Sequence, residues 1–238
     1  MYVFLTYADD KFKKSAELLV EEVKQSGLFE RVVVATPDLI PKNIRQKISK
    51  YLDQPRGGGY WLWKPIVTKI VYDQLKQGDV LFYADAGCSY NDSARGRMEY
   101  YLKVVNRNKP ILRFSYSNPF FQEDKWTTEE VFTYFSIPAA SQIRTTPQFM
   151  GGIFSVYKCK RGQKIIDAWY KIAVERPDLF SDDYKNNQKC PRFTDCRHDQ
   201  SIWSLIAKTN TDYINQLSEE PEMVNSPQIP IKALRRGK

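Results

Sequence analysis

The sequence lacks any apolar run long enough to cross a membrane, and it has no charged leader followed by an apolar core. Since a spanning helix needs about 20 apolar residues, we expect a soluble, cytoplasmic protein with no transmembrane segment and no signal peptide. Repeats and low-complexity segments are also absent. The 238 residues suffice for one domain with a full core. We predict that this domain covers residues 1–210 and that residues 211–238 form a tail that packs on it or extends from it.

Cysteine is scarce, and histidine occurs once. The cysteines are Cys88, Cys159, Cys190 and Cys196, and none of them form the closely spaced pairs that are typical of zinc sites. In the absence of a signal peptide we expect reduced thiols. A bridge between Cys190 and Cys196 is the alternative if the protein meets an oxidising compartment.

Acidic residues are outnumbered, because 36 Lys and Arg face 28 Asp and Glu and the formal net charge is +8. This balance favours anionic partners such as phosphates, nucleic acid or membrane surfaces. The basic residues are scattered apart from a terminal cluster of Lys232, Arg235, Arg236 and Lys238, which is typical of a solvated chain end. A stable nucleic-acid complex is therefore the second choice.

The first third of the chain predicts an α/β fold. Residues 2–7 form a strand pattern, a helix pattern follows from residue 12 to Gly27, and residues 31–36 form a second strand pattern. This order is typical of a mostly parallel central sheet of the Rossmann type, flanked by helices. Thr6 and Tyr7 then lie at the carboxyl edge of the sheet, where such folds bind ligands.

The stretch from Arg56 to Tyr90 is the most informative part of the chain. Three glycines at 57–59 and an aromatic cluster at 60–63 indicate a loop that carries flat rings. A helix is predicted from Pro65 to Gly78, and a buried strand over residues 80–83. Asp85 therefore follows a strand end, where its carboxylate can hold a metal. The alternative is that Asp85 opens the Asp-Ala-Gly turn.

The remaining patterns add further elements. Helices are expected over residues 42–52, 98–105 and 165–172, a strand over 110–114, and a helix whose capping box pairs Thr127 with Glu130. Residues 149–157 read as a strand in which Gly151 and Gly152 mark either a close approach or a bulge.

A polar loop over residues 177–197 leads to His198, Asp199 and Gln200 at the start of a short amphipathic helix. Asp199 is either the N-cap of this helix or a catalytic group. Prolines after Asn210 predict an irregular course along the surface.

Three separated motifs, GGYWLWKP, YADAGC and RHDQSIWSLI, together resemble the GT-A-fold glycosyltransferases of the nucleotide-diphospho-sugar transferase superfamily. The sequence is similar to small viral and bacterial sugar transferases of capsule or glycan synthesis, over roughly residues 1–210. The resemblance implies transfer of a sugar from a nucleotide-diphosphate sugar to a glycan or other hydroxyl acceptor, with Mn²⁺ or Mg²⁺ as cofactor.

The resemblance assigns the metal to Asp85, which matches the first aspartate of the superfamily's Asp-X-Asp motif. The sequence departs from that motif because Gly87 stands in place of the second aspartate. His198 is the residue that matches the late histidine ligand of the family. The metal would balance the charge that develops on the leaving diphosphate.

The resemblance also implies contacts to the donor. Thr6 and Tyr7 match the nucleoside-binding edge, Trp63 and Lys64 match the donor pocket with its phosphates, and Gly151, Gly152 and Gln200 match positions beside the donor sugar. Asp199 is the expected base that takes the acceptor's proton in an inverting enzyme; in a retaining enzyme it orients the sugar.

Two other functions compete with sugar transfer as an interpretation of the sequence. A nucleotidyltransferase shares the sheet and the acidic turn, but it normally has a glycine-rich basic signature after the first strand, where this chain has Tyr7-Ala8-Asp9-Asp10. The other alternative is a non-catalytic module that uses its positive charge to bind nucleic acid.

Overall fold

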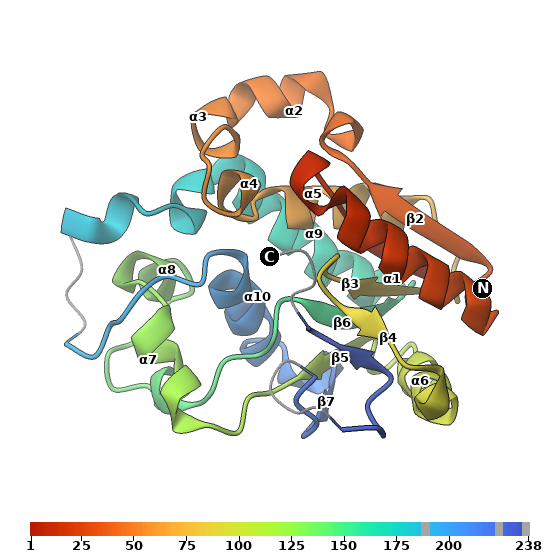
Figure 1. The fold of residues 1–238 in the computed structure, drawn as a ribbon. Coiled ribbons are helices and arrows are strands. Elements are labelled where there is room, and N and C mark those ends of the chain that lie inside the picture. Colours follow the sequence, from red (N-terminus) through yellow and green to blue (C-terminus); the bar gives the residue numbers. More distant parts are fainter. Residues whose placement is uncertain (187–190, 222–225, 235–238) are drawn as a thin grey trace.

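The structure, a computed structural model, describes residues 1–186, 191–221 and 226–234. Its centre is a six-stranded sheet with the strand order β2-β1-β3-β6-β5-β7 (Figure 1). These strands are β1 (Tyr2–Tyr7), β2 (Arg31–Ala35), β3 (Val80–Ala84), β5 (Ile111–Phe114), β6 (Ile153–Tyr157) and β7 (Ile214–Leu217). A separate two-stranded sheet pairs β4 (Ser89–Tyr90) with β8 (Ile231–Lys232).

The central sheet is mostly parallel, as predicted. Strands β2, β1 and β3 run in one direction, and β6 is antiparallel to both β3 and β5. Strand β7 is parallel to β5. Strand β6 is therefore the reversed member of this sheet, and its amino end lies at the same edge as the carboxyl ends of the other five strands. This edge carries the candidate site.

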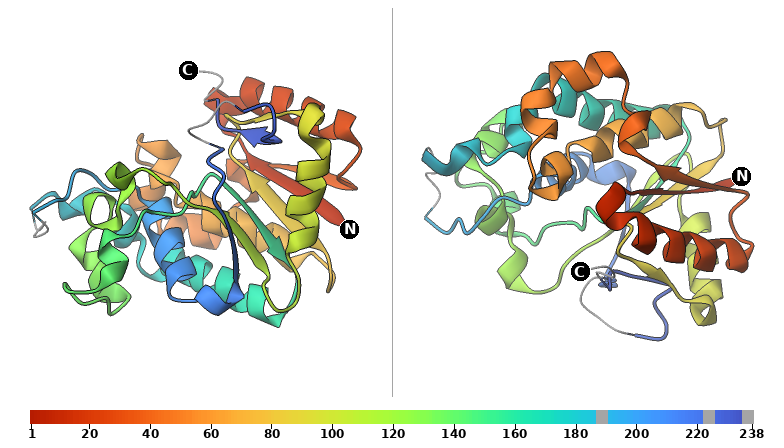
Figure 2. Two further views of the ribbon diagram at one scale, coloured as in Figure 1. Left: turned by 90° about the horizontal axis from the view of Figure 1, so that it is seen from below. Right: turned by 45° about the horizontal axis from the view of Figure 1, so that its top comes forward.

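Helices cover both faces of the sheet (Figures 1 and 2). Helices α1 (Lys13–Ser26) and α6 (Arg95–Val104) pack on one face. Helices α5 (Trp63–Asp73), α9 (Lys160–Glu175) and α10 (Asp199–Lys208) pack on the other. The predicted α/β class with flanking helices is confirmed.

Each face has its own core. On the first face, Leu19 of α1 and Met98 of α6 are buried against Phe4 and Phe82 of the sheet. On the second face, Trp169 of α9 and Trp203 of α10 pack with their rings tilted by 37° and the centroids 4.6 Å apart, and both contact Phe154 of β6. These large buried rings fix the position of α10, which begins at Asp199.

Shorter helices complete the described chain. They are α2 (Lys42–Lys47), α3 (Ser49–Leu52), α4 (Gly57–Tyr60), α7 (Glu123–Trp126) and α8 (Glu129–Tyr134), together with several 3-10 turns. The prediction of one helix over residues 42–52 is wrong, because the helix breaks at Ile48. Ile48 is 1% exposed and belongs to the core, and its backbone leaves the helical region at φ −115° and ψ 16°.

The predicted capping box is displaced by one residue. Thr128, not Thr127, caps α8, because its hydroxyl accepts a hydrogen bond from the Val131 N–H at 3.3 Å. The Thr127 hydroxyl instead donates to the Glu123 carboxylate at 2.7 Å inside the protein. A buried acceptor four residues earlier therefore decides which threonine is the cap.

The end of the chain differs from the irregular course that its prolines predict. Residues 214–217 extend the central sheet as β7, in register with β5, and residues 231–232 pair with β4. The strand predicted over residues 149–157 begins only at Ile153, so Gly151 and Gly152 precede it.

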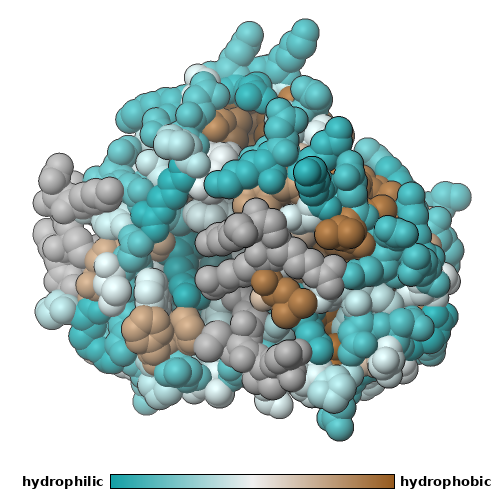
Figure 3. Space-filling model, in the orientation of Figure 1, coloured by the Kyte–Doolittle hydropathy of each residue, from teal (hydrophilic) through white to brown (hydrophobic). Residues whose placement is uncertain are grey.

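The cysteines Cys88, Cys159 and Cys196 are buried and form no disulfide within the described residues, in agreement with the expected reduced state. Cys190 lies outside the described residues, as do Arg235, Arg236 and Lys238 of the basic terminus. Within the described ranges, the helices are too short or too polar to span a membrane. The face seen in Figure 3 is mainly hydrophilic, and its hydrophobic patches are separate from one another.

Candidate active site

A cavity of about 630 Å³ opens at the edge of the sheet where the strands other than β6 end. It is lined by Tyr7 at the end of β1, by Asp85 directly after β3, and by Gly151 shortly before β6. Lys64 of α5 and Asp199 of α10 reach it from the helical layer. Residues from all three sequence motifs therefore meet in one place.

An ion cluster forms the floor of this cavity. The Lys64 ammonium is 2.7 Å from the Asp199 carboxylate and 3.2 Å from the Asp85 carboxylate, and it donates to the Gly151 carbonyl at 3.3 Å. Lys64 is 2% exposed, so its three N–H groups are used inside the protein. The Tyr83 hydroxyl donates to the same Asp85 oxygen at 2.6 Å.

Burial and charge act in opposite directions on this cluster. Burial lowers the pKa of Lys64, but the carboxylates of Asp199 and Asp85 raise it by more, and the net pKa lies above the ordinary value. Burial raises the pKa of Asp199 to about 6, against the opposing effect of Lys64. Lys64 is therefore an ammonium, and Asp199 changes its charge close to neutral pH.

A left-handed turn places the aromatic residues of the GGYWLWKP motif. Gly57, Gly58 and Gly59 have φ of +61°, +58° and +93°, and Tyr60 and Trp61 continue at +55°. A Cβ at Gly59 would lie 2.5 Å from the Leu52 carbonyl oxygen, so a side chain is excluded there. The glycine run is thus required by this backbone path.

Trp63 follows this turn and borders the cavity. Its ring stacks on Tyr7 with the centroids 3.7 Å apart, and its indole N–H donates to the Gly57 carbonyl at 3.1 Å. Both rings are less than one-tenth exposed. The structure therefore brings together Tyr7 and Trp63, which the sequence assigned to donor binding.

His198 has a strained backbone at the start of α10, with φ 50° and ψ −116°. Its ring stacks with Tyr60 and Trp61, and its Nδ1 is 2.6 Å from the Phe180 carbonyl oxygen. Burial lowers the pKa of His198, so the ring is neutral and Nδ1–H is the donor. Its Nε2 is buried without a hydrogen bond within the described residues and lies 3.9 Å from Asp182.

Asp199 is not an N-cap. His198 occupies the capping position without a side-chain cap, and Asp199 is the first helical residue. Its carboxylate turns to Lys64 because that ammonium is buried beside it at 2.7 Å. The prediction of a cap is thus wrong, and the side chain remains available to the cavity.

Gly151 allows α10 to approach the sheet. A Cβ at this position would lie 3.0 Å from the Gln200 Cβ and 3.3 Å from an Asp199 carboxylate oxygen. The Gln200 side chain accepts from the Gly151 N–H at 3.2 Å and donates to Gln148 at 2.8 Å. The close approach predicted at Gly151 is made by the protein itself, and both the amide oxygen and the amide nitrogen of Gln200 are hydrogen-bonded there.

Gly152 also lines the cavity, and its carbonyl accepts a hydrogen bond from the Asp85 N–H at 2.9 Å.

Thr6 is placed differently from the other predicted residues. It is completely buried and is not among the cavity-lining residues. Because successive side chains of a strand point to opposite faces, Thr6 and its neighbour Tyr7 cannot both face the cavity. The assignment of Thr6 to the donor site stays a prediction that this geometry does not favour.

Two side chains of the cavity have donor atoms that could ligate a metal. Asp85 offers a carboxylate that is 39% exposed, and His198 offers a buried, unpaired Nε2. Carboxylate oxygens suit Mg²⁺ and Mn²⁺. Across residues 1–186, 191–221 and 226–234, however, the structure groups no three His, Cys, Asp or Glu side chains suited to a metal. A metal at Asp85 would therefore need most of its ligands from substrate and water.

Two arginines of the cavity wall were not assigned from the sequence. Arg56 donates to Asp182 at 3.0 Å and to Asp195 at 2.6 Å. Arg197 stands directly before His198, inside the RHDQ segment. The available signals were that Arg197 is the first residue of the RHDQSIWSLI motif and that Arg56 stands two residues before GGYWLWKP.

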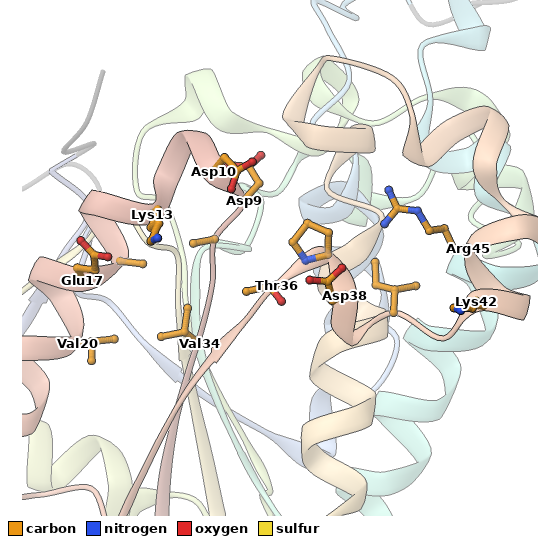
Figure 4. Close-up of a pocket in the computed structure, with 14 residues that line it drawn as sticks. Asp9, Asp10, Lys13, Glu17, Val20, Val34, Thr36, Asp38, Lys42 and Arg45 are labelled. Carbon is orange, nitrogen blue, oxygen red and sulfur yellow. The ribbon is translucent and has the colours of Figure 1, made fainter.

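A larger cavity of about 870 Å³ lies beside the first, between α1 and the segment after β2. In Figure 4, Asp9, Asp10, Lys13 and Glu17 lie on one side, and Asp38, Lys42 and Arg45 on the other. Asp9 lines both cavities. Both walls of this larger cavity carry acidic and basic side chains (Figure 4).

Comparisons with known proteins were made for sequence and for structure. No protein-family model matches the sequence. No curated protein matches it either.

Several glycosyltransferases are among the solved structures to which the fold is similar. One, involved in the glycosylation of the major capsid of PBCV-1, is 10% identical, with 93% of this chain and 82% of that chain covered and a TM-score of 0.48. Mouse xyloside xylosyltransferase 1 is 10% identical, with 91% and 84% covered and a TM-score of 0.45. The galactosyltransferase LgtC is 11% identical, with 90% and 72% covered and a TM-score of 0.42. At these identities and TM-scores the similarity carries no argument about the function of this chain.

Proposed function

We propose that the protein transfers a sugar from a nucleotide-diphosphate sugar to a hydroxyl group of a glycan or other acceptor. The observation that carries this proposal is the ion cluster in which the buried Lys64 ammonium joins the carboxylates of Asp85 and Asp199, in a cavity on the ligand-binding edge of an α/β sheet. The match of all three residues to motifs that resemble sugar transferases supports it.

The proposed step moves one proton and exchanges one bond. The acceptor oxygen forms a bond to the anomeric carbon, and the bond from that carbon to the diphosphate oxygen breaks, with its electron pair leaving on the diphosphate. Asp199 takes the acceptor's proton, since a base works best when its pKa lies near the operating pH. Its pKa of about 6 meets that condition. If the product retains the donor's configuration, Asp199 orients the sugar instead.

The other residues of the site bind and position. Lys64 holds Asp85 and Asp199 on either side of its ammonium. The stacked rings of Tyr7 and Trp63 line the cavity in which the donor would bind. Mn²⁺ or Mg²⁺ belongs to the proposal as a ligand of Asp85, with His198 as the second candidate ligand; bound there, it supplies charge neutralisation for the diphosphate.

The test is a panel of nucleotide sugars, each measured with and without MnCl₂. A true donor should raise the melting temperature, because a ligand that binds the folded state stabilises it. Release of the nucleoside diphosphate on addition of acceptor should follow. Lys64→Met should lose this activity, whereas Lys69→Met should keep it, because Lys69 pairs with Asp73 and Asp167 away from the cavity.

Two outcomes would overturn the proposal. One is a panel in which no nucleotide sugar stabilises the protein or is consumed. The other is release of inorganic pyrophosphate from a nucleoside triphosphate and a sugar phosphate, which would identify a nucleotidyltransferase.

A further inference from the structure

The cavity wall contains equal numbers of acidic and basic residues, so its overall charge does not explain how it would hold a diphosphate. The bases are Lys11, Arg56, Lys64 and Arg197, and the acids are Asp9, Asp85, Asp195 and Asp199. What matters is which cation is already balanced by a carboxylate, because a balanced cation attracts a further anion only weakly.

Two of these cations are balanced within the protein. Lys64 lies between two carboxylates, at 2.7 and 3.2 Å. Arg56 donates to two others, with distances of 3.0 Å to Asp182 and 2.6 Å to Asp195. We therefore expect neither Lys64 nor Arg56 to be the main phosphate-binding residue.

Arg197 is surrounded by aromatic rings and not by carboxylates of the described residues. Its guanidinium lies over three aromatic rings, 5.4 Å from the centroid of Tyr116 and 4.6 Å from those of Phe121 and Trp126. It donates one hydrogen bond, to the Tyr116 hydroxyl at 3.2 Å, and its backbone N–H donates to the Trp126 carbonyl at 3.1 Å. No carboxylate in the described part of the chain pairs with it.

This arrangement fixes the guanidinium plane without neutralising it. Aromatic rings attract a cation through their faces and restrict its orientation, but they leave its N–H groups unused. A guanidinium has five N–H donors, and a planar fork of such donors matches two phosphate oxygens. Lys11, the other cation of the wall without a carboxylate partner among the described residues, is exposed and has no such fork.

We propose that Arg197 binds the diphosphate of the nucleotide donor. This inference rests on the proposed function, and it moves the phosphate contact from Lys64, where the sequence placed it, to a residue in the motif before His198. Arg197 is a binding residue in this proposal, and the stacked rings of Tyr116, Phe121 and Trp126 keep its guanidinium in position.

The test compares Arg197→Gln, Arg197→Lys and wild type by titration calorimetry with inorganic pyrophosphate, with the donor found in the panel, and with its free nucleoside. Because each charge-assisted hydrogen bond contributes substantially to binding, Arg197→Gln should weaken pyrophosphate and donor binding by about tenfold to hundredfold. Arg197→Lys keeps the charge and should lose less. Binding of the free nucleoside should stay unchanged in both variants, which a purely structural role would not predict.

Arg192→Gln is the matched control, because Arg192 is about half exposed, pairs with Asp124 at 2.9 Å and does not line the cavity. Wild-type pyrophosphate affinity in both Arg197 variants, with sugar transfer intact, would overturn this inference and leave the proposed function standing. Equal weakening of nucleoside and pyrophosphate would also overturn it, since that pattern means a distorted cavity. A wild-type protein that uses no nucleotide sugar fails the proposed function instead.

Discussion

Replacing Asp199 by asparagine should remove activity while leaving the protein at least as stable at pH 7. The side chain is 4% exposed, and asparagine keeps its size and its ability to accept a hydrogen bond from Lys64. The substitution therefore removes the charge and the basicity with little change in packing.

The stability effect follows from the pKa of Asp199. Burial raises it from 3.8 to about 6, so the ionised carboxylate is less stable in the folded protein than in the unfolded chain. One pKa unit corresponds to about 1.4 kcal/mol, so this difference is on the order of 3 kcal/mol at pH 7. A raised pKa gives stability that is complete below pH 3.8 and is lost as pH rises through about 6. The Asp199→Asn variant would show no such loss, because its amide does not titrate.

The activity effect follows from the proposed proton transfer. A positioned general base contributes roughly 10²- to 10⁴-fold to the rate, so kcat should fall by about that factor while donor binding is retained. In the wild type, kcat should rise with pH through about 6, because Asp199 acts only when it is ionised. The variant's residual activity should lack this dependence.

The assays are urea unfolding between pH 4 and 8 and steady-state transfer over the same range. Asp167→Asn is the matched control, because the Asp167 carboxylate on α9 is 49% exposed and pairs with Lys69 of α5 at 3.1 Å. Wild-type turnover in Asp199→Asn would refute its catalytic role. If the unfolding free energy of Asp199→Asn at pH 7 were several kcal/mol below that of the wild type, the Lys64–Asp199 pair would outweigh the cost of burying the carboxylate. That result would refute the stability argument.

Three further substitutions test other parts of the site. Gly59→Ala should destabilise the protein by about 1–3 kcal/mol or more in urea unfolding, because Gly59 has a φ of +93° and a Cβ there would collide with Leu52. Gly27→Ala is the control and should destabilise the protein clearly less, because a Cβ there meets nothing within 4 Å. Equal destabilisation by the two substitutions would mean that the steric conflict at Gly59 is relieved. Asp85→Asn should abolish transfer without unfolding the protein, as judged by circular dichroism and product release, and near-normal activity at every Mn²⁺ concentration would exclude it as the metal ligand. His198→Ala should shift the Mn²⁺ dependence of transfer to higher concentration and be partly rescued by excess Mn²⁺; an unchanged dependence would remove His198 from the metal site.

Local sequence patterns predicted the parts of the fold that depend on neighbouring residues. The strand at residues 80–84 is completely buried, and its apolar run, bounded by glycines, was a sufficient signal for its position and for Asp85 beyond it. The strand at residues 214–217 gave no such signal. Its exposure alternates, and its partner among the described residues is β5, about 100 residues earlier in the chain, so pairing at the sheet edge decides its structure.

In the candidate site, too, the sequence predicted individual residues but not the contacts between distant segments. Motif resemblance identified Lys64, Asp85 and Asp199, but no local pattern shows that one ammonium joins two carboxylates from distant segments. Because of this pairing we propose that Lys64 positions the two acids and does not contact the phosphates. Arg197 was missed for the complementary reason: the proposal for it depends on the absence of a carboxylate partner within the described structure, which the sequence does not reveal.

The reversed direction of β6 explains how these distant segments meet. Because β6 is antiparallel to β3, its amino end lies beside the carboxyl end of β3, and the chain just before it passes the Asp85 turn. That places Gly151, with its bare Cα, against the first turn of α10 and its carbonyl against the Lys64 ammonium. A parallel strand at this position would present its carboxyl end instead, and the backbone at residue 151 would leave the site. The positions of Asp199 and Lys64 thus depend on strand direction and on one glycine as much as on their own attraction.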